Sequence, residues 1–187
     1  MVTSGSAAPP EIERLNDADE LGFAAMVGPL FEKAPRFLAR LAAARPFESP
    51  RVLFSHARQI ALRMPQAEQR ELIDAHPRIG AAPATVSALS FREQGYEADA
   101  ARLNTNEEDR QRTQAELDRL NAAYEQHFGF RFVVFVAGRP HSEIIRVMER
   151  RLRRAAKAEL NTALNEVVAI AEDRWRVLLA SGEEAAR

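Results

Sequence analysis

The distribution of proline constrains this chain most, because proline cannot continue inside a helix. Residues 20–83 are divided into short segments by Pro29, Pro35, Pro46, Pro50, Pro65, Pro77 and Pro83. No proline then occurs until Pro140. Short helices are therefore expected in the first half of the chain, and long helices are possible only in the second half.

Apolar residues recur at helical spacing on both sides of this division. Their pattern predicts helices over residues 51–64, 66–75, 107–127, about 141–153 and roughly 156–181. In the last of these, apolar positions from Leu160 to Leu179 are expected on the buried side. We therefore expect an all-α fold, a single-domain bundle of about eight helices.

The predicted domain occupies residues 12–182. Its length suits one domain, since domains typically have about 100–200 residues. A flexible N-terminal tail is expected over residues 1–11 and a short C-terminal tail over residues 183–187.

One short segment, about residues 130–136, does not follow helical spacing. Its residues are β-branched or aromatic, and Gly129 and Gly138 bound it. The chain has no second strong strand candidate, so this segment is expected to be extended without forming a sheet. Its backbone N–H and C=O groups then need other partners, and such groups are well placed to bind a polar ligand.

Composition excludes several kinds of chemistry. The 187 residues include no Cys, so disulfides, thiolate catalysis and Cys-ligated metals are excluded. Only Lys33 and Lys157 could anchor a cofactor through a Schiff base. The 26 basic and 27 acidic residues nearly balance, which argues against a nucleic-acid partner.

Neither a membrane span nor an export signal is expected. No uncharged apolar stretch approaches about 18 residues, and the first ten residues lack the pattern of a signal peptide. A cytoplasmic location is therefore the expectation.

His76 is the first candidate functional residue. Pro77 directs the preceding residue out of the helical region, so His76 should lie where the helix over 66–75 ends. Histidine titrates near neutral pH, which suits acid/base chemistry. The alternative is a histidine that only caps helix carbonyls. No two histidines have the spacing of an HExxH-type motif, so a histidine metal site has little support.

Ser90, Glu93 and Gln94 form the second candidate. Ser90 and Glu93 have the spacing of a capping box, with Ser90 as the N-cap of a helix over residues 91–103. Glu93 and Gln94 are adjacent polar side chains that could instead face a pocket. The spacing alone does not decide between these interpretations.

Arg174 is the third candidate, because it falls on the apolar side of the last predicted helix. A buried guanidinium needs a carboxylate, which either the protein or a ligand could supply. Alternatively, its stem could lie over the edge of the core while its head reaches water.

Taken together, these motifs resemble one family. His76-Pro77, Ser90-x-x-Glu93-Gln94, Tyr124, Phe128-Gly129-Phe130 and Arg174 occur in this order along the chain. Their order and spacing resemble the 2-oxo-4-hydroxy-4-carboxy-5-ureidoimidazoline (OHCU) decarboxylases, ureide-pathway enzymes that complete the conversion of urate to (S)-allantoin. The resemblance covers about residues 15–180.

The resemblance implies an all-α decarboxylase without cofactor or metal, acting on a small ureide and commonly a homodimer. It places His76 as the catalytic acid/base and Glu93 as the residue that orients or charges the imidazole. The substrate would contact Pro77, Ser90, Gln94, Arg174 and the backbone of Phe132, Val133, Val134, Phe135 and Val136.

Two alternatives remain at this stage. The family commonly has an acidic residue where this chain has Arg78, so a paralogue that acts on a related ureide is possible. A helical ligand-binding module without catalysis is the other, although intact His76, Glu93 and Arg174 argue against a decayed site.

Overall fold

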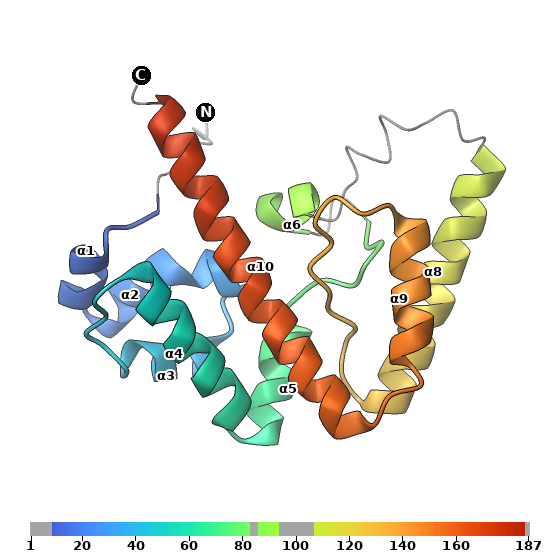
Figure 1. The fold of residues 1–187 in the computed structure, drawn as a ribbon, viewed down its shortest axis with the longest axis horizontal. Helices are drawn as coiled ribbons and strands as arrows, with labels where there is room; N and C mark the ends of the chain where they lie inside the picture. The colour runs from blue at the N-terminus through green and yellow to red at the C-terminus, as the bar shows by residue number, and fades with distance from the viewer. Residues whose placement is uncertain (1–8, 83–85, 94–106, 186–187) are drawn as a thin grey trace. The chain divides into compact units, whose positions relative to one another are not determined.

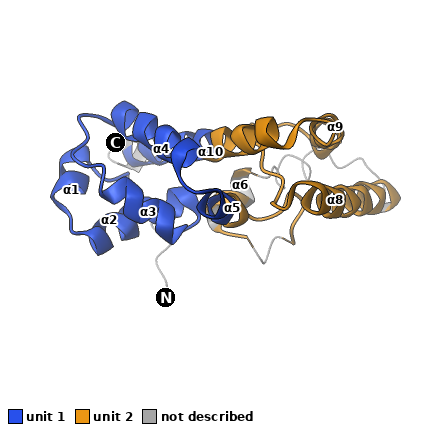
Figure 2. Ribbon diagram, turned by 90° about the horizontal axis from the view of Figure 1, so that it is seen from below, with its two compact units in different colours: residues 1–72, 168–187 blue, residues 73–167 orange. Residues whose placement is uncertain are grey.

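The computed structural model describes residues 9–82, 86–93 and 107–185. Within these ranges every regular element is helical, which confirms the all-α fold class (Figure 1). The chain divides into two compact units, residues 1–72 with 168–187 (unit 1) and residues 73–167 (unit 2) (Figure 2). Helices α5 (Gln66–Asp74) and α10 (Ala156–Ala185) each contribute to both units.

Unit 1 consists of short helices together with parts of α5 and α10. They are α1 (Ile12–Asp17), α2 (Glu20–Val27), the 3₁₀ helix η1 (Gly28–Phe31), α3 (Pro35–Ala42) and α4 (Pro50–Arg63). Prolines set several of these ends. Pro50 stands in the first turn of α4, where its missing N–H is tolerated, and Ser49 Oγ accepts a hydrogen bond from Val52 N–H at 3.3 Å. Pro65 ends α4 by holding Met64 in an extended conformation.

The core of unit 1 is rich in aromatic residues. Phe31 lies 4.8 Å from Phe37 between ring centroids, and Phe54 lies 5.9 Å from Trp175. Both pairs have the tilted or edge geometry that aromatic rings prefer. Trp175 thus joins the C-terminal part of α10 to the short helices of unit 1.

Unit 2 contains the end of α5, the first part of α10 and three further described helices. These are α6 (Ala88–Glu93), α8 (Glu107–Phe128) and α9 (His141–Arg151). Leu117, Leu120 and Tyr124 form the buried side of α8, as helical spacing requires.

The predicted extended segment is present in unit 2. Gly129 ends α8 with a φ of 72°, and residues 131–136 are neither helix nor strand. The segment runs as an uncoiled stretch between α8 and α9 (Figure 1). Phe132, Val133, Val134 and Val136 are buried, so the backbone crosses a helical core without a sheet to pair with.

Sequence periodicity located the long helices well. The predictions for α4, α5, α8 and α9 agree with the structure to within about two residues. The prediction for α10 was wrong at its end, because the helix continues to Ala185 and Leu179 is 45% exposed. Leu179 lies beyond Trp175, the last residue of α10 in the buried core.

Candidate functional site

His76 is buried just beyond the end of α5. The helix ends at Asp74, and the backbone N–H of His76 still donates to Ile73 O at 3.1 Å. Only 3% of His76 is exposed, and Pro77 next to it is half-buried. The imidazole is therefore in the protein interior.

The loop after His76 is held against α8 by two side chains. Asn121 Nδ2 donates to Ile79 O at 2.9 Å, and Gln114 Nε2 donates to Gly80 O at 3.0 Å. Gly80 has a φ of 76°, and a Cβ there would lie 2.9 Å from Leu117 Cδ1. Glycine is favoured at this position because a side chain would be strained in this conformation and would force Leu117 to shift.

Arg78 forms a two-pronged ion pair with α8. Its Nε donates to Glu125 Oε1 at 2.7 Å and its Nη2 to Glu125 Oε2 at 2.5 Å. The Arg78 side chain is 54% exposed. The residue that distinguished this chain from its expected family is thus part of a surface ion pair.

The capping-box prediction for Ser90 was wrong. Helix α6 begins at Ala88, so Ser90 lies inside it and is 2% exposed. Ser87 takes the capping position, since its Oγ accepts a hydrogen bond from Ser90 N–H at 3.2 Å. Glu93 is half-buried at the last residue of α6, and Gln94 lies outside the described residues.

Side chains bind several backbone groups of the extended segment. Arg151 Nη1 donates to Val133 O at 2.9 Å, and Glu166 Oε2 accepts from Phe135 N–H at 2.8 Å. Arg139 donates to the carbonyls of Phe135 and Val136.

Val134, like Phe132, differs from these neighbours. Within the described part of the chain, no hydrogen bond reaches its N–H or its C=O, although the residue is 4% exposed. Buried backbone groups are nearly always paired, so this pair of groups is available to a ligand or a water molecule.

A buried ionic cluster holds the other side of this segment. Glu159, which is fully buried, accepts from Tyr124 Oη at 2.5 Å and from Arg151 Nε at 2.5 Å. The Arg151 guanidinium also lies 4.6 Å from the centroid of the Phe132 ring. Burial raises the pKa of Tyr124 above its usual range, so the phenol stays protonated and donates to Glu159.

Sequence reasoning did not identify this cluster as a unit. Arg151 and Glu159 are eight residues apart on different helices, and their contact with Val133 depends on the path of the extended segment. A charged residue within an apolar stripe, as at Glu159, is the signal that could have indicated it.

Arg174 meets a carboxylate of the protein in unit 1. Its Nη2 contacts Glu32 Oε1 at 2.7 Å, and its Nη1 donates to Pro29 O at 3.0 Å and Leu30 O at 3.1 Å. The side chain is 1% exposed, so the interpretation in which its head reaches water was wrong. Its predicted contact with a substrate stays a prediction.

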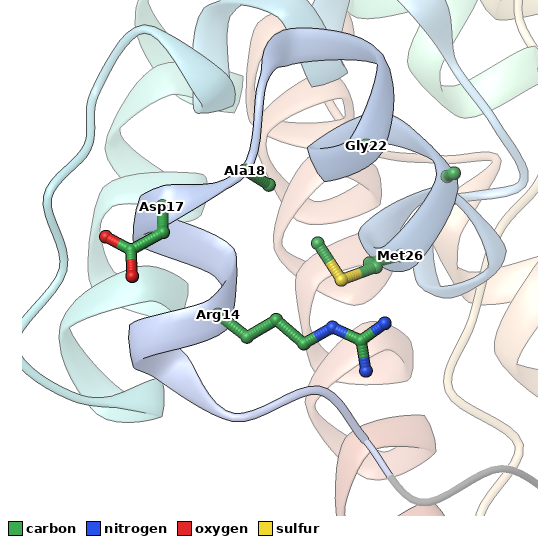
Figure 3. Close-up of a pocket in the computed structure, with 6 residues that line it drawn as sticks. Arg14, Asp17, Ala18, Gly22 and Met26 are labelled. Carbon is green, nitrogen blue, oxygen red and sulfur yellow. The ribbon is translucent and has the colours of Figure 1, made fainter.

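A separate surface hollow in unit 1 holds none of the predicted residues. It has a volume of about 720 Å³ and lies between α1 and α2 (Figure 3). Its lining consists of Arg14, Asp17, Ala18, Gly22, Ala25 and Met26. Without a buried titratable group, this hollow does not have the features of a catalytic site.

In residues 9–82, 86–93 and 107–185, no three His, Asp or Glu side chains gather closely enough to hold a metal ion. Among the helices of those same ranges, none combines the length and apolar character needed to cross a membrane.

Comparison with known proteins defines the class of this helical chain. The family model described as OHCU decarboxylase matches residues 16–176. Since this is most of the chain, the protein belongs to the OHCU decarboxylase family, a family of carbon dioxide-releasing lyases.

Individual relatives carry the same name. The chain is 30% identical over 163 residues to the 2-oxo-4-hydroxy-4-carboxy-5-ureidoimidazoline decarboxylase of Haloferax volcanii, covering 87% of this chain and 92% of that one. It is 28% identical over 177 residues to the Mus musculus enzyme, covering 95% and 97%. It also matches 33% of a longer uric acid degradation bifunctional protein of a Bacillus species, at 30% identity over 92% of this chain.

Solved structures support the fold. An OHCU decarboxylase crystallised in the presence of (S)-allantoin matches with a TM-score of 0.59 at 24% identity, over 79% of this chain and 92% of that one. An (S)-allantoin synthase matches with a TM-score of 0.63 at 19% identity, over 92% and 54%.

Proposed function

We propose that this protein decarboxylates 2-oxo-4-hydroxy-4-carboxy-5-ureidoimidazoline to (S)-allantoin, in the degradation of urate. The proposal rests on membership of the family and on relatives that carry this activity in their names over nearly their whole length. The structural observation that supports it best is the buried His76 at the end of α5.

The substrate can supply its own electron sink. Its carboxylate is next to a ring C=N bond, so breaking the carbon–carbon bond releases CO2 while the electron pair moves onto the ring nitrogen. A proton must then be delivered to the ring carbon from one face. The protein has to hold the carboxylate out of the ring plane, stabilise charge on the ring and supply that proton.

The residues predicted for these tasks receive the following roles. His76 transfers the proton, and Glu93 orients or charges its imidazole. Buried Ser90, together with Pro77 and Gln94, lines the substrate. Arg174 binds the substrate carboxylate or ureido oxygens.

The backbone of the extended segment binds the ring in this proposal. The unpaired N–H and C=O of Val134 fit a ring that presents both acceptors and donors. They belong to the stretch Phe132–Val136 that the resemblance assigned to substrate binding. The same proposal includes a homodimer, as the family resemblance implies, and a cytoplasmic location, which suits a chain without Cys.

Replacement of His76 tests the proposal. The substrate is generated from urate by the two preceding enzymes, and (S)-allantoin formation is followed by circular dichroism with a chelator present. His76→Ala should reduce the signal to the spontaneous, racemic background, whereas His127→Ala, an exposed histidine at the end of α8, should keep it. If His76→Ala forms (S)-allantoin at the wild-type rate, the assignment is wrong.

A further inference from the structure

Arg131 connects the end of α5 to the extended segment. Its backbone N–H donates to Asp74 Oδ1 at 2.8 Å. Its guanidinium Nη1 donates to Asp74 O at 2.7 Å and to His76 O at 2.9 Å. Arg131 therefore donates to both the side chain and the backbone of Asp74, and the same guanidinium holds the backbone of His76.

These contacts occur at the C-terminal end of a helix. The last carbonyls of an α-helix have no partner inside the helix, and α5 ends at Asp74. A cation at this end also interacts favourably with the partial negative charge of the helix terminus. Both side chains of the pair are half-buried, which shields their hydrogen bonds from solvent more than an exposed pair.

The geometry points to a role for Arg131: we propose that Arg131, held by Asp74, is a positioning residue that fixes the His76 imidazole for proton transfer. Binding the carbonyls of residues 74 and 76 restrains the backbone torsions between them. Those torsions set the direction of the Cα–Cβ bond of His76. Proton transfer requires a well-defined donor position, and a displacement of about 1 Å can reduce a rate by about 100-fold.

The same residue begins the stretch of backbone that is proposed to bind the ring. Arg131 directly precedes Phe132, and its own N–H is fixed by Asp74. The contacts of Arg131 therefore fix the position of the end of α5 with respect to the start of the extended segment, within unit 2. This inference rests on the proposed function, since it assigns the proton to His76.

Kinetics of the full chain test the role of Arg131. Arg131→Met keeps the aliphatic stem and the backbone contact with Asp74 but removes both bonds to the carbonyls. We expect kcat to fall about tenfold or more, while KM changes by less than about threefold. Arg131→Lys retains a cationic donor and should recover part of the loss. Arg119→Met, which removes an exposed ion pair on α8, is the matched control and should leave both constants unchanged.

A second measurement follows His76 directly. The imidazole resonances are recorded in histidine-labelled protein and assigned by their loss in His76→Ala. Arg131→Met should shift or broaden them, and Arg119→Met should not. Should Arg131→Met fail to fold, Arg131→Gln, a shorter neutral donor, takes its place in both experiments.

The two measurements separate this inference from the proposed function. Unchanged His76 resonances in folded Arg131→Met overturn the positioning role, whatever the activity. Shifted resonances with an unchanged kcat overturn it as well, and they also count against His76 as the proton donor. Full activity of His76→Ala removes the role of His76 as proton donor, and absence of (S)-allantoin formation by the wild type removes the proposed function itself. In both cases the resonances still report whether Arg131 orients the ring.

Discussion

Replacement of Glu159 gives the sharpest test of how unit 2 is held together. Glu159 is fully buried and accepts hydrogen bonds from Tyr124 and Arg151. The Arg151 side chain is only 6% exposed. In Glu159→Leu its guanidinium would keep the hydrogen bond to Val133 O, which is 2.9 Å long in the wild type. Its remaining carboxylate is Glu166, 3.9 Å away.

The expected loss of stability follows from this arrangement. Removing one partner of a buried ion pair typically costs about 3–5 kcal/mol, because the other charge remains buried without compensation. Glu166 partly compensates the charge of Arg151, so the loss for Glu159→Leu should lie at the lower end of this range, about 3 kcal/mol in the free energy of unfolding. For a chain of this length that is a fall in Tm of roughly 6–12 °C.

Urea unfolding followed by circular dichroism measures this difference. The double variant Arg151→Leu, Glu159→Leu removes both buried charges of the pair and should be less destabilised than Glu159→Leu alone. Glu116→Gln, which breaks an exposed pair with Arg119, should leave the urea midpoint unchanged. A loss below about 1 kcal/mol for Glu159→Leu, or a double variant less stable than the single one, would refute the reasoning.

Two further predictions concern the loop after His76 and a surface ion pair. Gly80→Ala should lower the free energy of unfolding by about 2–3 kcal/mol, because φ is 76° and its Cβ would meet Leu117. Gly138→Ala has a similar φ but open space, so urea unfolding should show a smaller loss; equal losses would mean that the contact with Leu117 is unimportant. The hydrogen bond from Arg40 lowers the pKa of Glu68, so this pair stabilises the protein above the pKa of the unfolded carboxyl and stops doing so as the pH falls through the lowered value. The difference in urea midpoint between wild type and Arg40→Met should therefore shrink on acidification, and a difference that grows would contradict this sign.

The ends of several helices and the position of His76 could be predicted from the sequence, because they depend on residues that are close together in the chain. Pro50 and Ser49 begin α4, and Pro65 ends it, through contacts within a few residues. His76 was placed correctly at the end of α5 because Pro77 acts on the residue before it. Gly129 likewise ends α8 through its own left-handed conformation.

Local sequence could not predict which of two serines, Ser87 or Ser90, caps helix α6. Ser87 and Ser90 are both good N-cap residues, so capping preference alone cannot select one of them. Ser87 is exposed and caps α6, while Ser90 lies inside the first turn of α6 and is buried. The burial of Ser90 depends on residues far away in the chain, which capping preferences do not take into account.

The sequence by itself determined the all-α class and the extended segment, and it offered a carboxylate partner as one of two alternatives for Arg174. Only the tertiary structure decided that this carboxylate is Glu32, 142 residues away, and that Arg131 holds His76 across 55 residues. Local propensities act over one or two helical turns, whereas these hydrogen bonds depend on how the whole backbone is folded. A pattern of residues can therefore require a partner for a buried charge without identifying it.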